Sequence, residues 1–433
     1  MNSRTPELSR LTLMCSDHEV AEFTWNHDRQ AVTGKTHVLD AAHAPLMATD
    51  PSGNITRDRL SSWFKNRGIP DFRPDAAGYP SAASLMASGF GASLSDQYWI
   101  RPAGSASTWR DVNCFENDFS EELGELLLPH DASSVPSLIE KIRGNADLLA
   151  SSPDAALNGN LPKRWTIEGG QRMLVKSGRS SGRFQEPFNE KIASVLCSRL
   201  LDEGDYVAYE LEDGGFMKWT SRCKPMTDQV TEFVPAWALL CSSKRPSDLG
   251  LHDFYVSACA AHGLDVREDV EKMLTIDYLM ANFDRHWNNF GVLIDSESRE
   301  WLRAAPVFDT GEALWCDREL SQPFDGYTTP RAGMMRPFAR KIDEQLGRYC
   351  RDLSWFDPSG LKGFSEEACD ILLGNPFIAN ERGRIDKIRE AIDLRAMMLT
   401  RHAHEIGSAR GFTVPDMGAV GATEAAKRTG LHL

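Results

Sequence analysis

Apolar side chains recur at helical spacing through the second half of the chain. Val270, Met273, Leu274 and Tyr278 fall on one face of a helix with 3.6 residues per turn, which predicts a half-buried helix around them. Two further helices are predicted, at residues 384–406 and at residues 365–373 with Ser365 as the N-cap. The second half of the chain is therefore expected to be mainly helical.

Short apolar runs separated by glycine pairs predict β-hairpins in the middle of the chain. Gly169 and Gly170 separate a run at residues 164–167 from a run at residues 172–176. A second hairpin is expected from runs at residues 205–211 and 216–223, joined through Asp213-Gly214-Gly215. Between the hairpins, the apolar positions Ile192, Val195, Leu196 and Leu200 share one face of a predicted helix. The pattern indicates an α+β protein.

The first 150 residues give a weaker pattern. Short apolar stretches at residues 11–14 and 20–25 are followed by polar turns and segments that contain Pro and Gly, which predicts mixed, mostly irregular structure. Ser151-Ser152-Pro153 marks the expected domain boundary. The predicted organisation is an accessory region at residues 1–150, a β-rich lobe at 151–230, a helical lobe at 231–410 and a flexible tail at 411–433.

Composition and charge narrow the function classes. A formal net charge of −14 opposes electrostatic attachment to nucleic acid or to an anionic membrane, because such binding draws on clustered Lys and Arg. No run approaches the roughly 18 apolar residues of a membrane helix, and the start of the chain lacks a signal-peptide pattern, so a cytoplasmic protein is expected. Nine cysteines without a C-x-x-C pair predict reduced, mostly buried thiols.

One glycine-lysine pair raises the possibility of a nucleotide-binding P-loop. Thr33-Gly34-Lys35-Thr36 resembles the end of a phosphate-binding P-loop. The first glycine of that motif would stand at position 29, where this chain has Arg29. The P-loop is therefore rejected, and a hairpin turn is predicted in its place.

Candidate chemistry concentrates in residues 277–317. Asp284, Asn289 and Asp309 offer oxygen atoms at loop positions next to predicted strands. Phosphoryl transfer needs Mg²⁺ bound by one or two hard oxygen ligands and a carboxylate that accepts the proton of the attacking hydroxyl. Asp284 could be the carboxylate that accepts the proton, and Asn289 and Asp309 could be the Mg²⁺ ligands. The competing interpretation is a hairpin whose Asp and Asn residues cap turns, with His286 packed in the core.

A lysine and a glutamate upstream suit the same chemistry. Lys176 ends an apolar strand, where its ammonium group can neutralise the α- and β-phosphates of a nucleotide. Such a lysine needs a carboxylate partner, and Glu190 opens the next helix fourteen residues later. Taken singly, each residue also fits a solvated strand end or a first helical turn.

These motifs resemble those of the HipA-like kinases. The pattern Asp-Arg-His-Trp-Asn-Asn at residues 284–289, followed by a hairpin and Phe-Asp-Thr-Gly, is similar to their catalytic segment, and also to the Asp-Arg-His-x-x-Asn loop of the distantly related phosphatidylinositol kinases. The resemblance implies a bilobal protein-kinase-like fold that uses ATP and Mg²⁺. It implies a phosphate loop before the first hairpin, here Asn158-Gly159-Asn160-Leu161-Pro162-Lys163, so Gly159, Lys163 and Arg164 are candidate nucleotide contacts. It also implies that His286 braces the catalytic loop.

The same resemblance implies transfer of the γ-phosphoryl group to a Ser or Thr hydroxyl of a protein, in a toxin-like or regulatory setting that includes autophosphorylation. Many relatives act with a small DNA-binding antitoxin, and no direct contact of this chain with nucleic acid is expected. Ser321, Thr328 and Thr329 fall in an activation-type loop that ends near residue 337. Two alternatives stay open: a lipid or small-molecule kinase, and a nucleotide-binding pseudokinase or interaction module.

Overall fold

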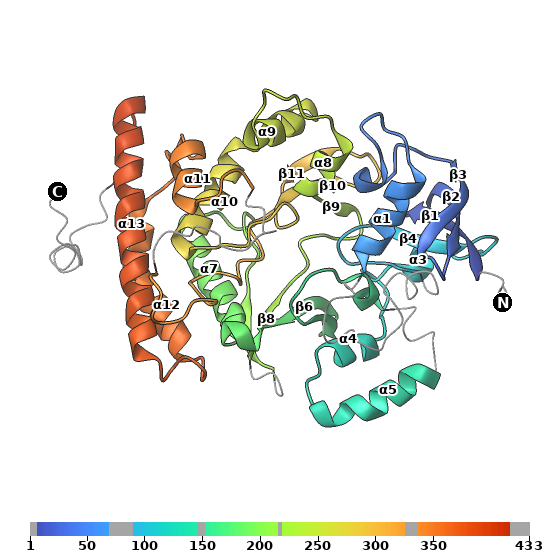
Figure 1. The fold of residues 1–433 in the computed structure, drawn as a ribbon, viewed down its shortest axis with the longest axis horizontal. Helices are drawn as coiled ribbons and strands as arrows, with labels where there is room; N and C mark the ends of the chain where they lie inside the picture. The colour runs from blue at the N-terminus through green and yellow to red at the C-terminus, as the bar shows by residue number, and fades with distance from the viewer. Residues whose placement is uncertain (1–6, 69–89, 145–151, 215–218, 325–336, 416–433) are drawn as a thin grey trace.

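The computed structural model describes residues 7–68, 90–144, 152–214, 219–324 and 337–415. Figure 1 shows an elongated molecule in which a small N-terminal sheet lies at one end and the long helix α13 (Arg382–Arg410) lies at the other. Strands β6 and β8 and the helices α7 and α10 lie between them. The candidate site residues come from this central part.

The N-terminal region is more ordered than its sequence pattern predicts. Its elements are β1 (Leu8–Cys15), β2 (His18–Asn26), β3 (Ala31–Val38), η1 (Leu46–Ala48), α1 (Arg57–Arg67), β4 (Tyr98–Pro102), α3 (Trp109–Val112), α4 (Glu122–Leu127) and α5 (Val135–Gly144). The strands form an antiparallel sheet in the order β3-β2-β1-β4, which corrects the prediction of mostly irregular structure. Leu11 and Leu13 face one buried cluster and Met14 faces another, so β1 lacks the apolar-polar alternation that would have revealed it.

One local prediction in this region is corrected. Gly34 lies inside β3 with φ of +73°, so Thr33 to Thr36 form part of a strand and not a hairpin turn. The pairing of β2 with β3 shifts register between Glu22 and Thr24, which accommodates the glycine.

The β-rich lobe is an antiparallel sheet in the order β5-β6-β8-β7, with helix α7 packed against β6, β7 and β8. Its elements are η4 (Pro153–Ala156), β5 (Lys163–Glu168), β6 (Gln171–Ser177), η5 (Ser180–Gly182), α7 (Glu186–Leu200), β7 (Glu210–Asp213) and β8 (Trp219–Cys223). Gly169 and Gly170 both have positive φ, at +56° and +83°, so the first predicted hairpin is confirmed with the turn that such glycines favour. The second hairpin is shorter than predicted, because residues 205–209 precede β7, and Asp205, Tyr206 and Val207 pair instead with Val307.

The remaining lobe is mainly helical. Its elements are β9 (Thr231–Pro235), α8 (Ala236–Ser242), α9 (Leu251–Ala261), α10 (Arg267–Met280), β10 (Gly291–Asp295), β11 (Trp301–Ala304), α11 (Ile342–Tyr349), η7 (Pro358–Leu361), α12 (Phe364–Leu373) and α13. The predicted stripe on α10 is buried in the largest apolar cluster of the described residues. Gly363, with φ of +71°, occupies the N-cap of α12, so the prediction of Ser365 at that position is wrong. The predicted α+β fold with a β-rich lobe and a mainly helical lobe is confirmed.

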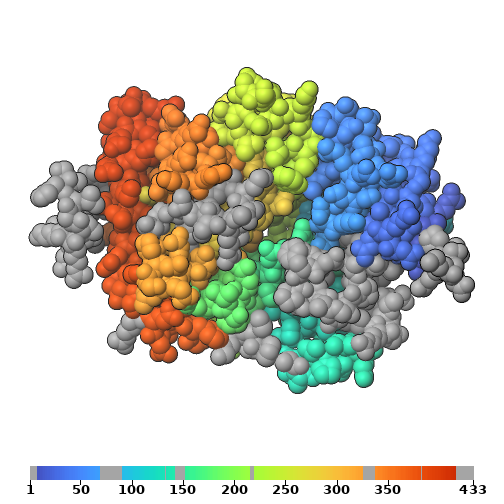
Figure 2. All heavy atoms as spheres, in the orientation of Figure 1, coloured from blue at the N-terminus to red at the C-terminus, as the bar shows by residue number. Residues whose placement is uncertain are grey.

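The N-terminal region packs against the segment that joins the two lobes. The Gln97 side chain donates to the carbonyls of Asp228 (2.7 Å) and Thr231 (2.9 Å), and Thr227 donates to the Leu94 carbonyl (2.6 Å). Arg59 reaches the Cys241 carbonyl of α8 at 2.8 Å. Figure 2 shows the blue N-terminal region packed directly against the yellow-green residues of α8 and α9. The accessory region is therefore built onto the connection between the lobes.

Several other predictions concern thiols, membrane helices and undescribed residues. All nine cysteines lie in the described part of the chain as free thiols, and eight of them are buried, as predicted. Among the described helices, none combines the length and the apolar character needed to cross a bilayer. Some predictions concern residues outside the described ranges and stay predictions. They are Thr328, Thr329, the domain boundary near residue 150 and most of the predicted tail.

Candidate active site

Lys176 joins the β-rich lobe to the helical lobe. Its ammonium group forms ion pairs with Glu190 of α7 and with Asp309, whose Oδ1 lies 2.6 Å from Nζ. Lys176 is 4% exposed and its Nζ also lies 5.4 Å from the centre of the Tyr209 ring. Burial opposes the charge, but the two carboxylates outweigh it and hold the pKa of Lys176 well above its ordinary value. The predicted lysine-glutamate pair is present, with an additional acidic partner.

Helix α7 fixes both acidic partners of Lys176. Ser221 of β8 donates a hydrogen bond to Glu190, so this carboxylate is held from two strands. The Asn189 side chain donates to the carbonyls of Gly311 (2.7 Å) and Ala313 (2.8 Å), which ties α7 to the corner that follows Asp309. A Cβ on Gly311 would lie 3.2 Å from Glu186 Cβ, so the close approach of this corner to α7 favours glycine.

Asp284 and Asn289 lie in the loop between α10 and β10. The Asn289 amide nitrogen donates to the Asp284 carbonyl at 3.1 Å, which leaves Asn289 Oδ1 as the oxygen that can bind a cation. Burial, helped by the neighbouring Asp309 charge, raises the pKa of Asp284 to about 6, although His286 opposes the shift. The side chain of Asp284 is 17% exposed. This environment gives a carboxylate with the basicity that a general base needs near neutral pH.

His286 makes a hydrogen bond within the same loop. Its Nδ1 lies 3.2 Å from the Asn288 backbone nitrogen, which donates to it, and its Nε2 lies 4.0 Å from Asp284 Oδ2. The imidazole is 37% exposed, which argues against the alternative of a packed core histidine. The contact with Asn288 lies within the loop itself, and the bracing role that the resemblance implies stays a prediction.

Asp309 stands in a backbone conformation with φ of +55°. It lies five residues beyond the end of β11, and not at the strand end as the sequence suggested. Burial alone would raise the pKa of this carboxyl group, but the Lys176 and Lys163 charges hold it well below its usual range. Asp309 is therefore charged at any physiological pH. A carboxylate oxygen and an amide oxygen are hard donors of the kind that Mg²⁺ prefers, so Asp309 and Asn289 suit a magnesium site by their chemistry.

The three candidate residues of the predicted phosphate loop do not all lie on the same side of the sheet. Lys163 lies directly opposite Lys176 in the β5-β6 pairing, so both side chains emerge on the same face of the sheet. A Cβ on Gly159, where φ is +115°, would collide with the Lys163 ammonium group, so the loop folds against this lysine. Arg164 points away, because neighbouring residues of a strand face opposite sides, and forms an ion pair with Glu125 of α4. The structure therefore brings Gly159 and Lys163 to the Lys176 side of the sheet, but not Arg164.

A buried ion pair beneath the catalytic loop was missed by the sequence analysis. The Arg285 guanidinium donates to both Asp277 oxygens at 2.9 Å and to the carbonyls of Asn289 and Phe308 at 2.6 Å. Asn282 also donates to Asp277 at 2.8 Å and accepts from the Asp284 backbone nitrogen at 3.0 Å. Arg285 is 2% exposed. This network fixes the backbone on both sides of the site, and local spacing in the sequence gave no signal for it.

Replacing Arg285 with methionine should destabilise the protein by about 3–5 kcal/mol, because the Asp277 carboxylate would remain buried without its cation. The exposed Arg267, which pairs with Asp265 at 2.7 Å, gives a matched control, and Arg267→Met should change stability by less than about 1 kcal/mol. Urea denaturation followed by circular dichroism measures both. Equal midpoints for the two variants would contradict the anchoring role of Arg285.

Two other side chains complete the surroundings. Arg179, just after β6, forms ion pairs with Glu312 and with Glu186 (3.4 Å) and acts electrostatically on Asp284. The Tyr209 hydroxyl lies 3.4 Å from the Asp309 backbone nitrogen, which donates to it. The Arg179–Glu312 and Tyr209–Asp309 contacts join residues far apart in sequence, so no local pattern pointed to them.

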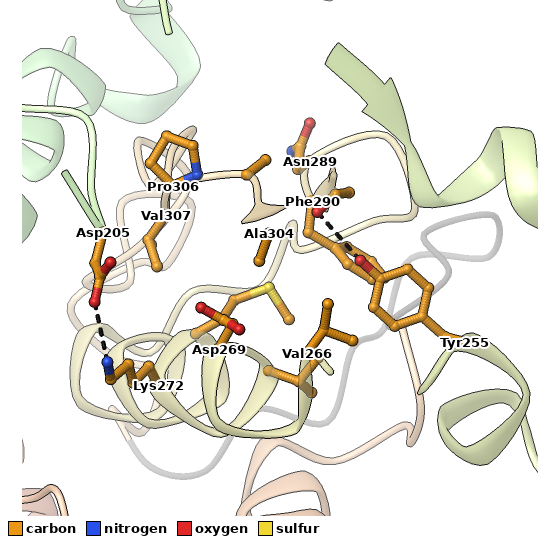
Figure 3. Close-up of a pocket in the computed structure, with 14 residues that line it drawn as sticks. Asp205, Tyr255, Val266, Asp269, Lys272, Asn289, Phe290, Ala304, Pro306 and Val307 are labelled. Carbon is orange, nitrogen blue, oxygen red and sulfur yellow. Dashed lines mark hydrogen bonds and ion pairs between the residues drawn. The ribbon is translucent and has the colours of Figure 1, made fainter. Parts of the chain in front are cut away.

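A cavity lies beside the loop that contains Asn289. Figure 3 shows it between α10 and the chain from Ala304 to Val307, with Asn289 at its rim and the Asp205–Lys272 ion pair (3.0 Å) at one end. The cavity walls are mostly apolar side chains such as Val266 and Phe290. Neither Lys176 nor Asp309 lines it. The cavity is therefore separate from the group of charged residues described above.

Comparisons with known proteins give a distant likeness. No protein-family model matches the chain. No curated protein matches it either. Among solved structures, the crystal structure of the proinflammatory kinase CtkA of Helicobacter pylori is similar, with a TM-score of 0.45 and 19% sequence identity over 59% of this chain and 95% of that chain. We therefore argue function from the contacts of this chain's own residues, above all the ion pair between Lys176 of β6 and Glu190 of α7.

Proposed function

We propose that the protein is an ATP-dependent kinase of the HipA type that transfers the γ-phosphoryl group to a Ser or Thr hydroxyl of a protein. The observation that carries the proposal is the position of the Lys176 ammonium group between Glu190 and Asp309, with Asp284 close enough to Asp309 for the two charges to interact. Residues from two lobes, more than 100 positions apart, meet in the combination that phosphoryl transfer requires.

Each side chain has a definite task in this proposal. Lys176 holds the α- and β-phosphates while Glu190 keeps it in place. Asn289 and Asp309 hold Mg²⁺, which screens phosphate charge when bound. Asp284 orients the acceptor hydroxyl and takes its proton as the acceptor oxygen bonds to the γ-phosphorus. The bond from that phosphorus to the β-γ bridging oxygen breaks, and ADP leaves with the electron pair.

The protein acceptor and the biological setting follow from the resemblance to HipA-like kinases. A net charge of −14 makes an anionic membrane an unfavourable surface for this chain, which favours a protein over a phosphoinositide acceptor. We also propose a cytoplasmic setting and a small DNA-binding antitoxin as the partner. Autophosphorylation would fall on hydroxyls such as Ser321.

Incubation with γ-labelled ATP and Mg²⁺ tests the proposal. Parallel reactions contain a cell-extract protein fraction or phosphoinositide vesicles, each with the wild-type chain and with the Asp284→Asn chain. Label on protein Ser or Thr that depends on Asp284 supports the proposal. Label in the lipid fraction alone would indicate a lipid kinase, and thermal stabilisation by ATP without any transfer would indicate a pseudokinase.

The pH dependence of the reaction should follow Asp284. Because the pKa of this carboxyl group is raised to about 6, the basic form is lost as pH falls through that value. The value of kcat/KM should therefore decline about tenfold per pH unit below pH 6 and level off above pH 7. Initial rates between pH 5 and pH 8.5, at saturating Mg²⁺, measure this. A profile without a break near pH 6 would argue against Asp284 as the base.

A further inference from the structure

A cluster of histidine and acidic side chains lies far from the kinase-like site, where the N-terminal region meets the β10-β11 turn. His18 begins β2, Asp40 and His43 follow β3, and Glu297 belongs to the turn between β10 and β11. The two imidazole rings are stacked, with centroids 3.8 Å apart and planes inclined by 10°. None of these residues has a role in the reaction proposed above.

The hydrogen bonds of the two rings define which nitrogen atoms carry hydrogen. His18 Nε2 lies 3.0 Å from Glu297 Oε1, and His43 Nε2 lies 3.0 Å from the Glu297 carbonyl oxygen. Both partners are acceptors only, so Nε2 is the donor in each ring. A neutral imidazole carries one N–H group, so the Nδ1 atom of each ring then presents a lone pair.

Both Nδ1 atoms face the same carboxylate oxygen. Asp40 Oδ2 lies 2.6 Å from His43 Nδ1 and 3.7 Å from His18 Nδ1. With Nε2 as the donor, the lone pair of His43 Nδ1 lies 2.6 Å from Asp40 Oδ2 and repels it, unless that ring is protonated or a cation lies between the two atoms. A protonated His43 would place its charge against the stacked His18 ring, whose Nδ1 would still present a lone pair to the same oxygen. A bound cation satisfies all three atoms at once.

The other Asp40 oxygen is already engaged. Asp40 Oδ1 accepts hydrogen bonds from the backbone nitrogens of Ala42 (2.9 Å) and His43 (3.4 Å). The carboxylate is thereby oriented so that Oδ2 alone faces the two rings. This arrangement holds a first acidic ligand in place by backbone contacts, as ligating carboxylates require.

We propose that His18 Nδ1, His43 Nδ1 and Asp40 Oδ2 bind one divalent transition-metal ion of the Zn²⁺ class, with Glu297 as the partner that holds both rings from behind. Two imidazoles and one carboxylate suit Zn²⁺ or Ni²⁺, and the imidazoles disfavour Mg²⁺ and Ca²⁺. Ligand atoms on a tetrahedral Zn²⁺ with bonds near 2.0 Å lie about 3.3 Å apart, between the two observed separations. The rings tilt away from parallel on binding, because the ion must lie in the plane of each ring.

The site would fasten the accessory region to the helical lobe. Its three ligands belong to the N-terminal region, whereas both outer hydrogen bonds end on Glu297 of the β10-β11 turn. Metal binding fixes the ring orientation and so strengthens these two bonds across the contact. The protein should consequently melt about 2–5 °C higher in saturating Zn²⁺ than in EDTA.

Isothermal titration of the metal-free full chain with ZnCl₂ tests the site, in a Cys241→Ser background because that thiol is only partly buried. We expect one Zn²⁺ per chain. Glu297→Ala should weaken binding by about tenfold, since the backbone acceptor of His43 remains, and His43→Asn or His18→Asn should weaken it by more than about 100-fold. The exposed His37 of β3 gives the matched control, and His37→Asn should bind Zn²⁺ like the parent chain.

A second measurement needs no variant and so does not depend on folding of the substituted chains. Co²⁺ added to the parent chain should give the visible absorption of a low-symmetry four-coordinate ion, and added Zn²⁺ should abolish it. Absence of Zn²⁺ uptake by the parent chain would overturn the proposal. So would uptake that survives both histidine substitutions, or a melting temperature that varies between pH 5 and 8 identically in Zn²⁺ and in EDTA, which would indicate protonated rings instead.

Discussion

Asp284→Asn should reduce kcat by about 10²- to 10⁴-fold while leaving the affinity for ATP nearly unchanged. Asparagine has the size of aspartate and keeps its carbonyl oxygen, so the hydrogen bonds of the loop backbone persist. It cannot accept the proton of the acceptor hydroxyl, so the substitution raises the free energy of the transition state and lowers kcat. Steady-state kinetics with varied ATP, together with ATP binding measured by calorimetry, separates the two effects.

A control variant and a stability measurement sharpen this test. Asp248 is exposed and lies in the loop before α9, so Asp248→Asn should leave both kcat and ATP binding unchanged. A large fall in ATP affinity in the Asp284→Asn chain would contradict the assignment of Asp284 as a base. Full activity in that chain would reject it.

The same substitution should also stabilise the fold at neutral pH. The folded pKa of Asp284, about 6, exceeds its ordinary value of 3.8, so between these pH values the folded chain keeps a proton that the unfolded chain has released. The contribution of this group to stability therefore falls as pH rises through that window and stays unfavourable above it. Asp284→Asn removes this penalty, on the order of 1–3 kcal/mol at pH 8, and has little effect near pH 4. Thermal melts at both pH values measure it.

Local patterns in the sequence predicted much of the candidate site. The glycine pair at positions 169 and 170 located the hairpin, and that hairpin placed Lys176 at a strand end. Helical spacing located α7 and α10, and with them Glu190 and the start of the catalytic loop. Each of these features depends on neighbours within about ten residues, which is the range over which turn chemistry and apolar periodicity act.

Features that depend on distant contacts were not predictable in this way. Arg285 is buried because it bonds to Asp277 and to the Phe308 carbonyl. The contact with Phe308 could not be predicted from residues near Arg285 in the sequence. Lys163 and Arg164 look equivalent in the sequence, but the strand alternation sends one toward Lys176 and the other toward α4. Strand β1 is buried on both faces, so the alternation that marks a surface strand is missing from it.

The second large effect is expected at Asp309. Asp309→Asn should lower kcat/KM by about 10³-fold and, unlike Asp284→Asn, should raise the Mg²⁺ concentration needed for half-maximal activity. The substitution removes the only carboxylate of the proposed metal ligands and leaves Asn289 with a second neutral amide. Magnesium titrations of activity and calorimetry of ATP binding with and without Mg²⁺ measure the change.

The fold should tolerate this substitution, because Lys176 keeps its ion pair with Glu190 and its contact with the Tyr209 ring. The amide oxygen that Asp309→Asn introduces can still accept a hydrogen bond from the same ammonium group. Loss of activity with a melting temperature near that of the wild-type chain would thus point to the metal and not to unfolding. An unchanged Mg²⁺ requirement would show that Asp309 serves mainly as a partner of Lys176, and the metal ligands would then have to be sought elsewhere around Asp284.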